Sequence, residues 1–251
     1  MTVLRAAIGA EWIKLWTTRT VWWSLAAALV LMAAGAAQYA LYAENGDLDA
    51  TVLRDGRVPA GNVAVLALSF AQLAFVALAM LAMTSEYSTG TMRATLTWVP
   101  SRVKLLLAKS AVVAAVTFVA GAVAGIVGGL IAKPLLGDLG EAGGIPPTAL
   151  RIGAYLALLG VFAVGLGAAL RGPVVTLVVL LMLIVVLPPL LQVPDVAVLN
   201  GIADALPGVA GNHFLLGDSD PYAPGLGLLI VAVWAVGGFV LGCRELDRRD
   251  A

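Results

Sequence analysis

Residues 85–109 read SEYSTGTMRATLTWVPSRVKLLLAK and form a polar island in an otherwise apolar chain. An apolar run of about 20 residues, long enough to cross a bilayer, stands before the island, and another follows it. A polar segment flanked in this way is a loop between two membrane-spanning helices, not a surface loop of a soluble domain. We therefore expect the function of the protein to depend on what binds this loop.

The composition indicates a polytopic membrane protein. The chain has 251 residues, of which 61% are hydrophobic and 12% are charged, about half the charged fraction of soluble domains. The net charge is zero, so electrostatics give no argument for nucleic-acid binding. The single cysteine, Cys243, excludes an intramolecular disulfide and a multi-cysteine metal site, and the single histidine, His213, excludes a histidine cluster.

The apolar runs predict an all-α fold with six transmembrane helices in a single transmembrane domain over residues 1–251. Each run has about the 20 residues that a helix needs to cross the bilayer, and a helix satisfies its own backbone there. Arg171, Gly172 and Pro173 separate the fourth run from the fifth and predict a tight hairpin. The predicted spans are residues 21–42, 62–84, 105–132, 149–170, 173–192 and 222–243.

Lysine and arginine residues beside the spans predict the orientation. With both termini in the cytoplasm, eleven of the fifteen basic residues fall inside and four fall outside. The acidic residues lean the other way, with five inside and ten outside. The sequence therefore predicts that both termini and the polar island are cytoplasmic.

The segment before the first span, residues 1–20, predicts an amphipathic helix lying in the inner leaflet, in contact with membrane lipids. At 100° per residue one apolar arc forms, and Glu11 and Lys14 lie well away from its centre. The arc consists of Leu4, Ile8, Trp12, Leu15 and Trp16. A plain cytoplasmic extension of the first span is the alternative. A cleaved signal peptide fits less well, because about 19 residues precede a run that is itself about 22 residues long.

Within the island, residues 85–104 predict a cytoplasmic loop with a short helix. Ser85 is placed to cap this helix, and Glu86 puts negative charge in its first turn. Gly90 interrupts the helix, Thr91 is placed to cap a second one, and Pro100 ends the pattern. The alternative is an ordinary positively charged inside loop with no specific partner.

Two sequence patterns carry a resemblance to a known family. Glu86-Tyr87-x-x-Gly90-Thr91-x-Arg93, followed by Pro100-x-Arg102 and Lys109, resembles the loop between the second and third helices of ABC transporter permeases of the type-2 exporter class. Glu11-x-x-Lys14-Leu15-x-x-x-Arg19 resembles the opening interfacial helix of the same family.

The resemblance implies the membrane half of an ATP-driven exporter in a prokaryotic plasma membrane. Two permease subunits, identical or different, would pair with two separate ATPase subunits, which would bind ATP and Mg²⁺. The polar island would be the coupling helix seated on the ATPase, and the turn at Arg171 would make a second, smaller contact. The residues that the resemblance assigns to ATPase coupling are Ser85, Glu86, Tyr87, Gly90, Thr91, Arg93 and Arg171.

Other classes of protein lack their motifs in this sequence. There is no G-x-x-x-x-G-K-[ST] loop, so we expect no nucleotide or other cofactor on this chain and no catalytic or metal site. A membrane enzyme would need a nucleophile with a base, or metal ligands, and a proton- or sodium-coupled transporter usually needs a charged group within its spans. A non-transporting sensor or assembly subunit remains as an alternative. The substrate is not readable, although neutral spans favour an amphipathic one.

Two further patterns predict local structure. Glycines recur every four residues at Gly121, Gly125 and Gly129, and again at Gly238 and Gly242, which favours close helix packing within the subunit over a dimer seam. In the outer segment, residues 193–221, Asp195 is placed to cap a helix that Pro207-Gly208 would end. The resembled family has short re-entrant helices at this place.

Overall fold

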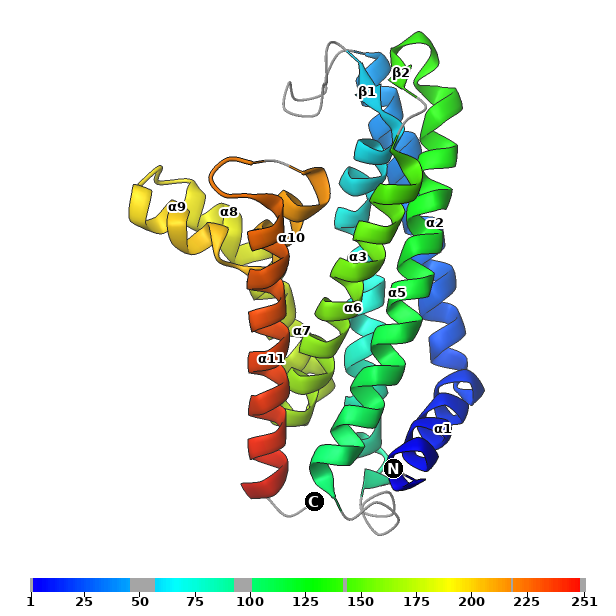
Figure 1. The fold of residues 1–251 in the computed structure, drawn as a ribbon, viewed down its shortest axis with the longest axis vertical. Helices are drawn as coiled ribbons and strands as arrows, with labels where there is room; N and C mark the ends of the chain where they lie inside the picture. The colour runs from blue at the N-terminus through cyan, green and yellow to red at the C-terminus, as the bar shows by residue number, and fades with distance from the viewer. Residues whose placement is uncertain (1, 46–56, 93–100, 142–143, 218, 249–251) are drawn as a thin grey trace.

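The computed structural model describes the chain except residues 1, 46–56, 93–100, 142–143, 218 and 249–251. It is a bundle of long helices (Figure 1), and its described residues contain only two short strands, β1 (Val58–Pro59) and β2 (Gly140–Glu141), which pair in parallel. The all-helical prediction is confirmed.

Six helices of the described chain are long and apolar enough to cross a membrane, which confirms the predicted spans. The turn at Arg171 and Gly172 separates the fourth span from the fifth as expected. The spans are α2 (Arg19–Glu44), α3 (Ala60–Ser88), α5 (Arg102–Leu135), α6 (Ile145–Leu170), the continuous segment Pro173–Gln192, and α11 (Pro224–Arg248).

Helix α6 is the centre of the bundle and packs mainly against α5 and α11. The glycine stripes lie in these two contacts. A Cβ atom on Gly125 would lie 3.0 Å from the Ala149 backbone of α6, and one on Gly242 would lie 2.7 Å from the Gly165 carbonyl oxygen, also of α6. Both stripes therefore bring helices of one subunit into close contact, and the prediction of intrasubunit packing is confirmed.

Helix α1 (Thr2–Thr17) leans away from α2 at the end of the bundle that also carries the last turn of α11 (Figure 1), called here the inner end. The chain bends at Thr18, whose backbone is extended, within the range 1–20 predicted for the interfacial helix. Helix α1 packs mainly on α5.

The face of α1 that is buried differs from the predicted apolar arc. Ala7, Glu11 and Leu15 are buried, whereas Trp12 is 46% exposed. Leu4, Ile8 and Trp16 are half-buried at the edge of this face. The expectation that Glu11 lies away from the packed face is wrong, because charged partners on other helices compensate its burial.

The fifth span contains a π-helical segment, Met182–Val186, between α7 (Pro173–Leu181) and α8 (Leu187–Gln192). Pro188 and Pro189 have no N–H, so the Ile184 carbonyl finds no donor in the α-helical or the π-helical register. The N–H of Leu187 accordingly donates to the Met182 carbonyl, five residues back. The span is continuous, but its hydrogen bonding is weakened at this point.

The outer segment folds differently from its prediction. Its first helix, α9 (Ala197–Asp204), has Val196 at the N-cap, and Asp195 instead adopts a left-handed conformation and accepts a hydrogen bond from Asn200. Pro207, which was predicted to end a helix, instead begins a second one, α10 (Pro207–Leu216). Proline suits the first position of a helix because that N–H has no partner anyway. Helix α10 packs on α11.

Candidate functional site

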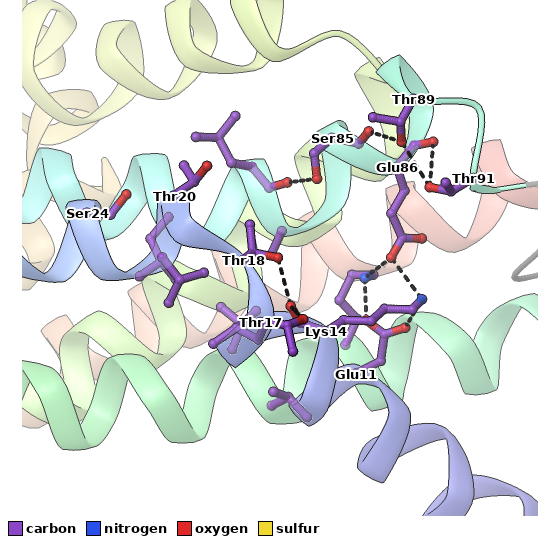
Figure 2. A pocket seen from close by; sticks show the side chains of 18 residues that line it. Glu11, Lys14, Thr17, Thr18, Thr20, Ser24, Ser85, Glu86, Thr89 and Thr91 are labelled. Atoms are coloured by element: carbon purple, nitrogen blue, oxygen red, sulfur yellow. Dashed lines mark hydrogen bonds and ion pairs between the residues drawn. The ribbon is translucent and has the colours of Figure 1, made fainter.

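Four charged side chains from three helices meet at the inner end, and we call them the charge cluster: Glu11 and Lys14 of α1, Glu86 of α3 and Lys109 of α5 (Figure 2). Lys109 Nζ lies 2.8 Å from Glu86 Oε1 and also binds Glu11 Oε2. Lys14 Nζ lies 2.9 Å from Glu11 Oε1 and 3.1 Å from Glu86 Oε1. The cluster thus ties α1 to the ends of two spans.

The charge cluster is largely out of contact with solvent. The side chains of Lys109, Glu11 and Glu86 are 4%, 5% and 10% exposed, and that of Lys14 is 44% exposed. Burial alone raises the pKa of the Glu11 carboxyl, but the ammonium groups of Lys109 and Lys14 outweigh it and hold this pKa below its ordinary value. The carboxylates and ammoniums balance, and the buried carboxylates of Glu11 and Glu86 depend mainly on the buried ammonium of Lys109, which contacts both.

Lys109 is the functional residue whose contacts sequence reasoning missed. From the sequence, Lys109 was expected to be one of the cytoplasmic basic residues and part of the resemblance. The spans were expected to be nearly free of ionisable groups. Yet residue 109 falls inside the predicted third span, 105–132, and a lysine there has to find a carboxylate. That placement was the available signal for a buried ion pair.

The first half of the polar island belongs to the end of α3, not to a separate short helix. Ser85 lies inside α3 and donates its hydroxyl to the Leu81 carbonyl oxygen at 2.6 Å. The helix ends at Ser88, and Gly90 follows with a φ of +70°. The predicted cap at Ser85 and the first-turn role of Glu86 are therefore wrong, because helix α3 of the second span continues through these residues.

The other island residues divide by exposure. Thr91 is exposed, and its hydroxyl lies 3.0 Å from that of Thr89, while Gly90 is also exposed. Glu86, in contrast, is buried in the charge cluster. Arg93 lies outside the described residues, as does the stretch up to Pro100.

Arg171 and Tyr87 form a second tie at the inner end. The Arg171 guanidinium lies 5.3 Å from the centre of the Tyr87 ring, and the Tyr87 hydroxyl donates to the Ala168 carbonyl of α6 at 3.4 Å. Arg171 also donates to the Glu245 carbonyl of α11 at 3.3 Å, and Arg102 of α5 donates to the Leu246 carbonyl. Cations at the C-terminal end of α11 suit its dipole. Arg171 thus links α3, α6 and α11.

Two cavities flank these elements. One, of about 460 Å³, adjoins the charge cluster between the α1–α2 bend, α3 and α5. The other, of about 470 Å³, lies toward the outer end between α3, α6, the fifth span and α10. Its polar lining residues include His213, Gln72, Asn212 and Tyr155, whose hydroxyl donates to Gln72 Oε1 at 2.9 Å. His213 stacks on Tyr222, with ring centres 5.0 Å apart.

The charge cluster contains no arrangement for covalent chemistry. Its carboxylates are paired with ammonium groups, and the part of the chain that the structure describes holds no group of three or more His, Cys, Asp or Glu side chains placed to bind a metal. What the arrangement does is mechanical: it joins helices that carry different parts of the inner surface.

Comparison with known families identifies the family to which this chain belongs. No curated protein matches the chain. Residues 7–194 match the family described as ABC-2 family transporter protein, a range that begins in α1, includes all four cluster residues and ends just after α8. The match covers well over half of the chain, so this protein is a member of the ABC-2 family of transporter membrane proteins, a non-catalytic, multi-pass transmembrane component.

Proposed function

We propose that this chain is the permease subunit of an ATP-driven exporter whose ATPase is a separate polypeptide. Family membership supports a transport role, and the sequence carries no phosphate-binding loop of its own. The asymmetry of basic residues supports cytoplasmic termini, and the resemblance to type-2 exporters implies a prokaryotic plasma membrane as the location. The partner ATPase would bind ATP and Mg²⁺.

This proposal rests on two sets of contacts behind the polar island: the charge cluster at Glu86 and the contact between Tyr87 and Arg171. The exposed residues Gly90 and Thr91, at the end of α3, belong to the surface that we assign to the ATPase contact. Directly behind it, Glu86 is fixed to α1 and α5, and Tyr87 is fixed to α6 and α11 through Arg171. Movement of the island would therefore be transmitted to α1, α5, α6 and α11 through Glu86 and Tyr87.

This arrangement gives the predicted coupling residues two different roles. Ser85, Gly90, Thr91 and Arg93 remain candidates for direct contact with the ATPase. Glu86, Tyr87 and Arg171 act behind the contact and position it. The same division applies to α1, where Glu11 and Lys14 hold the helix in place while Trp12 remains exposed for the lipid headgroup region.

We assign the exposed apolar faces of the bundle to lipid and a second permease subunit, and the outer cavity to the transported substrate. The first span, the fifth span and α11 leave large apolar side chains exposed, among them Trp23, Val174 and Val233, for lipid and for a second permease subunit. The outer cavity offers amide, hydroxyl and imidazole groups among apolar walls, and no Asp, Glu, Lys or Arg is among its described lining residues. An amphipathic substrate with little net charge suits such a cavity.

The test is reconstitution with the ATPase. The full chain is tagged and purified from its native membrane, the co-purifying ATPase is identified by its phosphate-binding loop, and ATP hydrolysis is measured with and without the permease in proteoliposomes. We expect hydrolysis to depend on the permease. A chain that purifies without an ATPase would support the sensor or assembly reading instead.

Orientation is tested separately by thiol labelling in a Cys243→Ser background. Cysteine in place of Asp49 should react with an impermeant reagent from outside the cell, and cysteine in place of Thr95 should not. Outside labelling at residue 95 would contradict the cytoplasmic placement of the island, and with it the coupling proposal.

A further inference from the structure

The cavity beside the charge cluster has two kinds of wall. Its polar wall is formed by the cluster and by hydroxyl-bearing side chains, which run along the α1–α2 bend on one side and along the end of α3 on the other (Figure 2). Its apolar wall comes from α2, α3 and α5. The apolar lining residues include Val21, Leu78, Leu81, Ala82, Val112 and Val113. A cavity of this kind fits a molecule with one polar end and one apolar end.

The hydroxyl groups of the polar wall present lone pairs, because their hydrogens are already donated. Ser85 donates to the Leu81 carbonyl at 2.6 Å, and Thr89 donates to the Ser85 carbonyl at 2.8 Å. Thr18 donates to the Lys14 carbonyl at 2.7 Å, and Thr17 also donates to the backbone of its own helix. A hydroxyl has one hydrogen and two lone pairs, so each of these four oxygens is left as an acceptor.

The charge cluster adds one more acceptor and no excess positive charge. Its two carboxylates and two ammoniums balance, and Lys14 and Lys109 each donate to two carboxylate oxygens. Glu86 Oε2 is buried and has no hydrogen-bond partner among the described residues. These acceptors, beside a cluster without excess positive charge, favour a ligand rich in N–H groups over an anion.

We propose that this cavity binds the protonated primary amine of an amphiphile, with its three N–H groups toward the Ser85 and Thr89 oxygens and its apolar chain against the α3–α5 wall. The amine has two possible sources, an ethanolamine lipid headgroup from the inner leaflet or a free long-chain alkylamine. The site lies at the inner end, apart from the outer cavity assigned to the transported substrate, and does not depend on what that substrate is.

The test measures lipid retention by native mass spectrometry of the purified full chain. Phosphatidylethanolamine, phosphatidylcholine and phosphatidylglycerol with identical acyl chains are added in turn. Only the first has a primary amine, and the quaternary ammonium of the second has the charge without the N–H groups. Dodecylamine, dodecanol and dodecyl phosphate are then compared as competitors and as ligands.

We expect dodecylamine to bind and the alcohol and the phosphate not to. Retention of phosphatidylethanolamine and its displacement by dodecylamine identify a lipid as the source, whereas binding of dodecylamine alone identifies a free amine. The paired substitution Ser85→Ala with Thr89→Val should weaken amine binding about tenfold, since two hydrogen bonds to a charged group are lost. Ser88→Ala is the matched control, because Ser88 also donates to a backbone carbonyl of α3 but does not line the cavity.

Ala82→Leu is a second, independent test of amine binding, since the larger side chain fills the apolar half of the cavity without touching a polar group. It should also abolish amine binding while phosphatidylglycerol retention stays unchanged. Equal retention of all three lipids, preferential binding of dodecyl phosphate, or amine binding that survives both the paired substitution and Ala82→Leu would overturn the proposal.

Discussion

The inner and outer ends of this bundle are held together in different ways. At the inner end, paired charges and arginine–carbonyl contacts join α1, α3, α5, α6 and α11. At the outer end, helix α10 packs through Gly208 and Gly211 beside a cavity with a Tyr155–Gln72 hydrogen bond, next to a fifth span whose backbone bonding is interrupted by two prolines. The contrast indicates that the inner end moves as one unit and that rearrangement is concentrated at the outer end.

The largest effect is expected from removing Lys109. Lys109→Met would leave Glu11 and Glu86 buried without their shared cation, and breaking a buried pair in this way costs about 3–5 kcal/mol. Lys14→Met is the control, since that side chain is 44% exposed and its pairs contribute about 0–1 kcal/mol. Denaturant unfolding in detergent measures both. Equal losses for the two variants would mean that the cluster is solvated.

At the outer end, the sharpest substitution is Gly208→Ala. A Cβ atom at Gly208 would lie 2.3 Å from the Ile184 carbonyl oxygen, so α10 must shift from the π-helical segment, at a cost of about 1–3 kcal/mol. Gly201→Ala in α9 is the control, because its Cβ would meet nothing within 4 Å. We expect Gly208→Ala to change transport as well as unfolding. Wild-type transport in that variant would argue against movement at this contact.

A smaller effect is expected at the polar pair of the outer cavity. Tyr155→Phe removes the hydroxyl that donates to Gln72 Oε1 at 2.9 Å, with a loss of about 1 kcal/mol. In the exposed pair on α2, where Gln38 Nε2 donates to the Tyr42 hydroxyl, Tyr42→Phe should cost less. If the cavity contacts substrate, Tyr155→Phe should also raise the apparent KM for transport, whereas Tyr42→Phe should leave it unchanged.

The smallest expected effect is a pH dependence of the contact between α1 and the bundle. The pKa of Glu11 is lowered from its ordinary value of 4.5, so its contribution is present at neutral pH and is lost as the pH falls through the lowered pKa. The pKa of Lys14 is raised above 10.5: burial lowers it, but Glu11 and Glu86 outweigh this. Its contribution is therefore lost only at strongly alkaline pH. Proteolysis of α1 in detergent should stay slow from pH 5 to 9 and accelerate below the Glu11 pKa. Acceleration already between pH 5 and 6 would contradict this order.

The sequence predicted the spans well, because a run of apolar residues long enough to cross the bilayer has few alternatives. It predicted the ends of the spans less well. Ser85 and Glu86 look like a helix start when read locally, yet they continue α3, since apolar residues precede them without a break. Likewise Pro207 is equally suited to end one helix or to begin the next, and only tertiary packing against α11 decides between them.

The pairing of side chains within the charge cluster could not be predicted from the sequence, for a different reason. Each of its members has an ordinary explanation alone, as a cytoplasmic charge near a membrane surface. Their pairing depends on how α1 leans across α5, and this follows from the bend at Thr18 and from packing between segments 72 to 98 residues apart in the chain. Glu11, Lys14 and Glu86 were among the predicted site residues, and their role in coupling stays a prediction, whereas the contacts of Lys109 with them were not predicted.

We propose that Glu86 transmits ATPase movement from behind the contact surface, and that Arg93, which lies outside the described residues, contacts the ATPase directly. The most direct measurement compares Glu86→Gln with Arg93→Ala for thermal unfolding, for ATPase retained per folded permease, and for stimulated ATP hydrolysis. We predict that Glu86→Gln lowers the unfolding temperature and the stimulation but keeps the ATPase bound, and that Arg93→Ala unfolds normally but releases the ATPase. Loss of the ATPase from Glu86→Gln with unchanged unfolding would contradict the account and make Glu86 a direct partner contact.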